Sequence, residues 1–206
     1  MRLIKSLTMK NIVLFKILFF CFVLVHAQEY QIDKPATFKG KPSNIDEFVQ
    51  SNLQYPNEEW WDCKQGTVII EGIVTVDGSF IELSIAESVT PLMDIEALRI
   101  ADLMQSWKPA KLKRNAVNSK VRIKVDFFLS QNEINQIEIF KKYGLHDKMP
   151  IFVLDGKVVN GRLAIESYNV KSVRVLKGKN ATDKYGQLGE NGVIEIESKR
   201  GTPPLF

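Results

Sequence analysis

The sequence predicts an α+β protein: a two-layer sandwich of an antiparallel three-stranded sheet with two helices, followed by a small α/β unit. Three segments alternate apolar and polar residues with the period of a half-buried strand. Two other segments repeat apolar residues at helical spacing. Their order along the chain is helix, hairpin, helix, strand, which makes a two-layer unit of about 95 residues.

The hairpin is the first predicted part of the sheet. Apolar residues occupy alternate positions over residues 67–76, and Asp77-Gly78 follows as the commonest short hairpin signal. The return strand covers residues 79–86, where the alternation places three apolar side chains on one face: Ile81, Leu83 and Ile85.

The third strand has the clearest alternation in the chain. Apolar residues at positions 121, 123, 125, 127 and 129 alternate with charged residues at 120, 122, 124 and 126. One face must therefore be buried and the other wet, and an antiparallel sheet covered by helices on one side meets that need.

Two helices are predicted to cover this sheet. The first starts at a Ser43 cap and ends before Pro56, and the second spans about residues 93–107 and is stopped by Pro109. The apolar stripe of the second helix consists of Met93, Ala97, Ile100, Met104 and Trp107, with Glu96 and Arg99 on the polar side.

The N-terminus predicts an export signal. Residues 1–27 carry four basic residues and no acid, and nine apolar residues precede a small-residue cleavage site at Val25-His26-Ala27. Nine is far below the roughly 20 residues that span a bilayer. The mature protein is thus expected in the periplasm. Two alternatives stay open: Met9 as the true start, and an uncleaved anchor over residues 12–25 that would leave the protein associated with the membrane.

Composition argues against several functions. Without residues 1–27 the chain has 24 basic and 24 acidic residues, so it offers no basic surface for nucleic acid. Cys63 is then the only cysteine, which excludes an intramolecular disulfide. The remaining histidine, His146, stands beside Asp147 in a connector without nucleophile or metal-ligand spacing. We therefore expect no catalytic residues, no metal and no cofactor.

A smaller unit is predicted over residues 149–201, after a helical connector at 131–148. It contains four short strand patterns, at residues 151–154, 157–159, 173–176 and 193–196, and helical turns at 163–167 and 180–186. Roughly 50 residues provide little core, so this unit must pack on the first domain or on a partner. The expected divisions are a signal peptide (1–27), a lead-in (28–42), the first domain (43–130), the connector, the small unit and a tail (202–206).

Five short pieces, in order, make the segment from Phe38 to Leu129 resemble the C-terminal domain of TonB, a periplasmic protein that docks on outer-membrane transporters. They are Asn52-Leu53-Gln54-Tyr55-Pro56, Gly66-Thr67-Val68, Val76-Asp77-Gly78, Glu96-Ala97-Leu98-Arg99 and Trp107-Lys108-Pro109-Ala110. The resemblance implies an interaction domain rather than an enzyme, with an outer-membrane TonB-dependent transporter or another envelope protein as its partner.

The resemblance also implies strand addition, in which a transporter peptide pairs with the last strand. An open sheet edge presents unpaired backbone donors and acceptors that an extended peptide can satisfy. The candidate binding residues are Tyr55, Pro56, Lys120, Val121, Arg122, Ile123, Lys124 and Val125. An equal alternative is that the three basic residues only protect the edge against self-association. An edge of this kind could also support a weak homo-oligomer.

The adjacent tryptophans Trp60 and Trp61 stand in a polar segment. Because two neighbouring large side chains rarely both point inward, one of them is a candidate for an exposed partner contact.

The small unit resembles a segment found in the plug region of TonB-dependent transporters. The matching pieces are Pro150-Ile151-Phe152-Val153-Leu154-Asp155-Gly156, Ser172-Val173-Arg174-Val175-Leu176-Lys177, Asn180-Ala181-Thr182, Tyr185-Gly186 and Asn191-Gly192-Val193-Ile194-Glu195-Ile196. The resemblance implies that this unit could bind another TonB-like protein in place of a transporter plug.

The sequence thus predicts a periplasmic protein–protein interaction module of the TonB-dependent transport system. The lead-in of about ten to fifteen residues reaches roughly 50 Å at most, which is short for coupling to the inner membrane. Two alternatives remain, a structural adaptor of the cell envelope without a transport role and a subunit of an envelope enzyme.

Overall fold

The first unit of the protein is a three-stranded antiparallel sheet in the order β3-β2-β7. The computed structural model describes residues 32–145, 148–159, 161, 163 and 169–199. The central strand β2 (Gly66–Val74) pairs with β3 (Phe80–Glu87) on one side and with β7 (Ser119–Phe127) on the other. The predicted α+β class and the three-stranded antiparallel sheet are confirmed.

Both predicted helices are present, with shifted ends. The helix α2 (Ile45–Asn52) starts one residue later than expected, because Asn44 rather than Ser43 accepts the capping hydrogen bond from Glu47. The helix α4 (Pro91–Leu103) starts after a Thr90 cap. It ends before Trp107, which lies instead in the short strand β4 (Trp107–Lys108).

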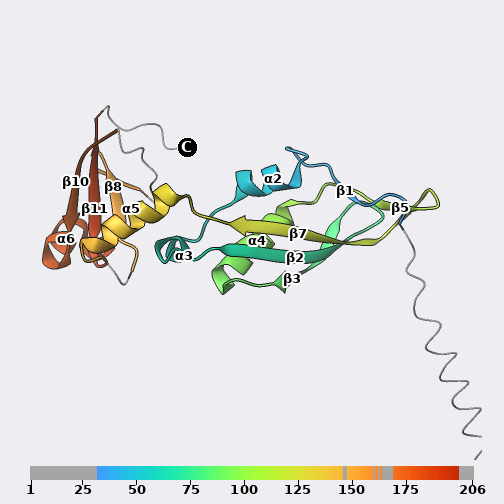
Figure 1. Ribbon diagram of the computed structural model, residues 1–206, viewed down its shortest axis with the longest axis horizontal. Helices are drawn as coiled ribbons and strands as arrows, with labels where there is room; N and C mark the ends of the chain where they lie inside the picture. The colour runs from blue at the N-terminus through green and yellow to red at the C-terminus, as the bar shows by residue number, and fades with distance from the viewer. Residues whose placement is uncertain (1–31, 146–147, 160, 162, 164–168, 200–206) are drawn as a thin grey trace, which may run out of the picture.

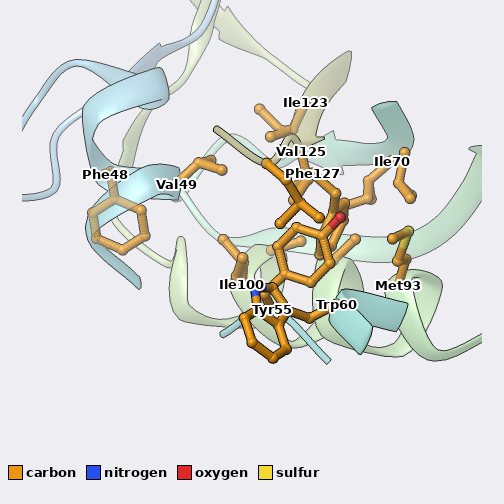
Figure 2. Packing of buried hydrophobic residues seen from close by; sticks show 14 of the residues in the cluster. Phe48, Val49, Tyr55, Trp60, Ile70, Met93, Ile100, Ile123, Val125 and Phe127 are labelled. Atoms are coloured by element: carbon orange, nitrogen blue, oxygen red, sulfur yellow. The ribbon is translucent and has the colours of Figure 1, made fainter. Parts of the chain in front are cut away.

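The core of this unit lies between the sheet and the helices. Figure 2 shows side chains from both helices meeting side chains from β2 and β7, and those labelled are all buried: Phe48, Val49, Ile70, Met93, Ile100, Ile123, Val125 and Phe127. The wet face of β7 carries the charged residues, as its alternation predicts.

The prediction for the return strand was wrong at one position. Ile81 is 42% exposed and Phe80 is buried in its place. Two residues of β3 oppose Gly72, between the pairs Glu71–Ser84 and Ile73–Ile81, and Glu82 there has a φ of 54°. Because such a bulge adds one residue to β3, the side chains beyond it point to the opposite faces of the sheet from those that period-two alternation predicts.

Two small ribbons extend the first unit and were not predicted. The strand β1 (Thr37–Phe38) lies in the expected lead-in and pairs with β4. The strands β5 (Ala110–Leu112) and β6 (Asn115–Val117) form a hairpin after Pro109. Strands of two or three residues are too short to show a period, so the sequence carried no signal for them.

The second unit is a four-stranded mixed sheet in the order β10-β11-β8-β9. Its strands are β8 (Ile151–Leu154), β9 (Lys157–Val159), β10 (Val170–Leu176) and β11 (Val193–Ser198), and β8 runs parallel to β11. All four predicted strands are present. The expected turn at residues 163–167 lies outside the described residues except for Leu163, as do the proposed signal peptide, tail and His146.

Helices pack on both faces of this second sheet. The helix α5 (Gln131–Lys142) contributes Ile137 and Phe140 to the same cluster as Phe152 and Ile194. On the other face, α6 (Gly178–Tyr185) buries Ala181 against Val153 and Val193, and the short helix η2 (Gly186–Gly189) follows it. The predicted helical connector is therefore part of the packing of the second unit.

A short helix that the sequence did not predict, α3 (Asn57–Trp61), lies between the two sheets (Figure 1). Trp60 and Trp61 are each 1% exposed, so the expectation of an exposed tryptophan was wrong. Trp60 packs edge-on against Phe152, with ring centroids 6.2 Å apart. Phe140 packs against the ring of Phe152, at a centroid distance of 5.7 Å. Both tryptophans are buried because a second unit, distant in sequence, covers the helix.

No helix among the described residues is long and apolar enough to cross a membrane.

Candidate functional site

The candidate site is the outer edge of β7. This strand pairs along its full length with β2, from Ser119 opposite Val74 to Phe127 opposite Gly66. Within the part of the chain that the structure describes, no other strand pairs with β7. The position of β7 at the end of the sheet meets the first requirement for strand addition.

Hydrogen bonds around the sheet show which backbone groups of β7 face outward. The backbone N–H of Thr75 donates to Ser79, and Glu71 O accepts from the Ser84 hydroxyl, so odd-numbered residues of β2 point their backbone groups toward β3. The even-numbered residues of β2 then bond to their partners on β7, the odd-numbered residues of that strand. The backbone groups of Lys120, Arg122, Lys124 and Asp126 therefore face away from the sheet.

One outward carbonyl is already occupied. The amide of Gln50, on α2, donates to Asp126 O at 3.3 Å. Figure 1 shows α2 alongside β7, on the side away from β2, and the two elements are in contact. The outward groups of residues 120–124 are consequently the part of the edge that is better placed for a guest strand.

The side chains of the same residues make the edge basic. Lys120 Nζ and Arg122 Nε bind the two oxygens of Glu71 at 2.7 and 3.0 Å, and Lys124 lies opposite Ile69. Two of the three cations on this part of the wet face thus bind the same glutamate. The alternating residues Val121, Ile123 and Val125 face the core, where the last two are buried.

The two cations hold the pKa of Glu71 below the ordinary value for glutamate, chiefly through the hydrogen bonds from Lys120 and Arg122. A depressed pKa in the folded state means that Glu71 stabilises the fold above the unfolded value of about 4.3, and that this contribution disappears as the pH falls through the folded value. Glu71 was not singled out from the sequence, although the register of β2 against β7 places it between two cations.

We expect Glu71→Gln to lower the urea midpoint of unfolding at pH 7 and to have progressively less effect toward pH 3, because the advantage of the wild-type carboxylate in the folded state shrinks once the pH falls below the unfolded pKa. Equilibrium unfolding of both proteins across this pH range measures the difference. Glu87→Gln is the control, since Glu87 is an exposed carboxylate on β3. An equal difference at pH 7 and pH 3 would contradict the ion-pair role of Glu71.

Tyr55 and Pro56 lie elsewhere. The Tyr55 ring packs edge-on against Phe127, the last residue of β7, and its hydroxyl donates to Lys64 O. Pro56 precedes α3 as its cap residue and is half-buried. Lys120 is seven residues from Phe127, about 23 Å along an extended strand. The predicted site residues therefore form two separate groups, one at the basic edge and one at the C-terminal end of β7.

A partly buried ion pair holds the chain that leads to Tyr55. Glu96, predicted on the polar face of α4, is only 7% exposed. It accepts two hydrogen bonds from Arg99 at 2.7 Å and one from the backbone N–H of Gln54 at 2.7 Å, while Arg99 also donates to Asn52 O. The Glu96 carboxylate raises the pKa of Arg99 through these bonds. The pair fixes the middle of α4 to the segment after α2.

Together these features define a class of protein: a small α+β interaction domain whose three-stranded sheet ends in a basic, unpaired edge strand. Residues 51–129 match the family model "Gram-negative bacterial TonB protein C-terminal", so this part of the chain is similar to the C-terminal domain of TonB. The match covers less than half of the chain and includes the whole sheet of the first unit. It ends at residue 129, so the plug-like resemblance of the second unit stays a prediction.

Among solved structures, the chain is similar to the NMR solution structure of the Helicobacter pylori TonB C-terminal domain, residues 179–285. The identity is 22% and the TM-score 0.32, over 42% of this chain and 78% of the other. No curated protein matches the chain. In the described residues, no group of three or more histidine, cysteine, aspartate or glutamate side chains is placed to hold a metal ion.

Proposed function

We propose that this protein is a non-enzymatic, periplasmic interaction module of the TonB-dependent transport system. It binds an extended segment of an outer-membrane transporter by strand addition along β7. The observation that carries this proposal is the outward backbone row of Lys120, Arg122 and Lys124 on the last strand of a domain that matches the TonB family model.

Charge supports an acidic guest. A residue directly opposite Arg122 in an added antiparallel strand would point its side chain to the same wet face as Arg122. Lys120, Arg122 and Lys124, of which the first two already bind Glu71, would attract carboxylates at alternate guest positions. The guest residues between them would point to the core side, where apolar side chains fit better. The preferred guest is therefore a short segment that alternates acidic and apolar residues.

The test uses a probe of that composition, a peptide of alternating glutamate and valine, and its counterpart with lysine in place of glutamate. We expect Lys124→Pro to weaken binding of the acidic peptide by about tenfold or more, because proline removes an outward N–H and adds a ring at the open edge. The bonds from β7 to β2 are made by the odd-numbered residues, so the sheet itself should persist. Titration followed by calorimetry measures the loss.

Lys124→Ala is the matched control, because it removes the charge but keeps the backbone donor. It should weaken binding less than Lys124→Pro. Equal binding of the two peptides would contradict the preference for an acidic guest, and equal loss in the two variants would contradict recognition through the backbone edge.

A second candidate is a structural adaptor of the cell envelope, and the packing between the two units favours it. One hydrophobic cluster runs from the first unit through Trp60 to Phe152 and Ile194 in the second. Capture of envelope proteins by residues 28–206 distinguishes the candidates. Recovery of outer-membrane transporters supports the first, whereas recovery of peptidoglycan or inner-membrane partners alone supports the second.

A further inference from the structure

The second unit has an open strand edge of a different kind. The strand β10 is the outermost strand of its sheet and pairs with β11, and no other described strand pairs with it. Figure 1 shows it at the end of the molecule, away from the first unit. It is seven residues long, and four consecutive residues, Lys171 to Arg174, are exposed. Among them Val173 is a large apolar residue with 45% of its surface exposed.

The neighbouring hydrogen bonds identify the outward backbone groups of β10. Ile151 N–H donates to Gly192 O, and Asp155 N–H donates to Ile196 O. Even-numbered residues of β11 therefore point toward β8, and odd-numbered ones such as Glu195 point toward β10. Since Glu195 lies opposite Arg174, the backbone groups of Arg174 face inward and those of Val173 and Val175 face outward.

The cations on β10 lie beside carboxylates of β11. Glu197 accepts hydrogen bonds from Lys171 and Ser172, and Glu195 lies directly opposite Arg174. Glu195 also accepts hydrogen bonds from Lys184 and Tyr185 of α6. With two cations and an exposed valine at its centre, β10 is less protected against pairing with a copy of itself than β7 with its three cations.

We propose that β10 pairs antiparallel with β10 of a second copy of this chain, joining the two four-stranded sheets into one. In the register that uses the whole strand, the two Val173 residues lie directly opposite each other and exchange both backbone hydrogen bonds. Arg174 of each copy then lies opposite Ser172 of the other, with Glu195 and Glu197 next along the row. No like charges lie directly opposite in this arrangement.

Antiparallel pairing of β7 with β7 of a second copy is unfavourable. Antiparallel pairing centred on Arg122 places the two Arg122 side chains opposite each other and each Lys120 opposite a Lys124. Self-association is therefore assigned to the second unit, which leaves the β7 edge of both copies open.

The experiment is sedimentation equilibrium of the full chain and its variants. Pairing through one short strand falls below the roughly 1,000 Å² of a stable interface, so a weak association with a dissociation constant of about 100 µM is expected. Val173→Lys places two cations opposite each other and should raise the dimer dissociation constant about tenfold or more. Val173→Glu should do the same. A mixture of the two variants should form a heterodimer, because opposite charges then face each other.

Ile139→Lys is the control, because Ile139 is a similarly exposed apolar residue on α5 and should leave the association unchanged. A wild-type chain that is monomeric up to 1 mM, about tenfold above the expected constant, would overturn the proposal. Equal dimerisation of the wild type and Val173→Lys, or a mixture of the two variants that does not associate, would also overturn it. Circular dichroism of each variant confirms that the sheet is intact.

Discussion

Replacing Trp60 by alanine is expected to lower the free energy of unfolding by about 3–5 kcal/mol, the usual loss for deleting a large buried aromatic side chain. Trp60 is 1% exposed and packs against Phe152 from the second unit. The cavity would therefore open where the two units meet, and the loss should affect both. Denaturant unfolding followed by tryptophan fluorescence and by far-UV circular dichroism measures it.

Two variants sharpen this prediction. Trp60→Phe keeps a ring in the cluster and removes an indole N–H that has no hydrogen-bond partner among the described residues, so it should cost much less than alanine. Ile139→Ala, on the exposed side of α5, should change the stability little. If the wild type unfolds in two well-separated steps, or if Trp60→Ala leaves the second unit as stable as before, the two units do not share a core.

Replacing Glu96 by alanine is expected to cost about 1.5–3 kcal/mol, the range for hydrogen bonds that involve a charged group. The substitution leaves Arg99 without its carboxylate and Gln54 N–H without its acceptor at 2.7 Å. Arg99 is about one-third exposed and can recover hydration, which keeps the loss below that of a fully buried pair. Thermal unfolding monitored by circular dichroism measures the effect.

Glu96→Gln is the matched variant. A glutamine oxygen can still accept from Gln54, but a glutamine cannot make a charged two-point contact with Arg99. The free energy of unfolding of this variant should therefore lie between those of the wild type and Glu96→Ala. Glu47→Ala, an exposed carboxylate in the first turn of α2, is the comparison at the surface and should cost well under the Glu96 value. A loss for Glu96→Ala no larger than for Glu47→Ala would contradict the role of the pair.

Sequence reasoning reached the sheet of the first unit because its strands alternate strongly. The alternation over residues 119–129 required one buried and one wet face, and β7 has both. It failed at Ile81, because the bulge at Glu82 depends on how two strands meet. It also missed Glu71 and Gln50, which matter only through neighbours on other strands and helices.

The burial of Glu96 and of the two tryptophans was likewise not predictable from the local sequence pattern. Helical spacing placed Glu96 on the polar side of α4, yet the segment after α2 lies over it and supplies hydrogen bonds. The polar residues around Trp60 suggested an exposed loop, yet Phe152 of β8 packs against Trp60, and Phe140 of α5 packs against Phe152. Burial of a single side chain depends on which distant segment packs there, and local patterns carry little information about that.

By itself the sequence determined which of the longer segments of this protein become strands and helices and, apart from the bulged end of β3, which face of each is apolar, because side-chain direction alternates with a fixed period along each element. The tertiary structure alone decided that β7 and β10 are edges, that two cations of β7 bind one glutamate of β2, and that α3 joins the two units. These properties depend on pairing and contact between residues far apart in the chain, whose partners only the folded arrangement specifies.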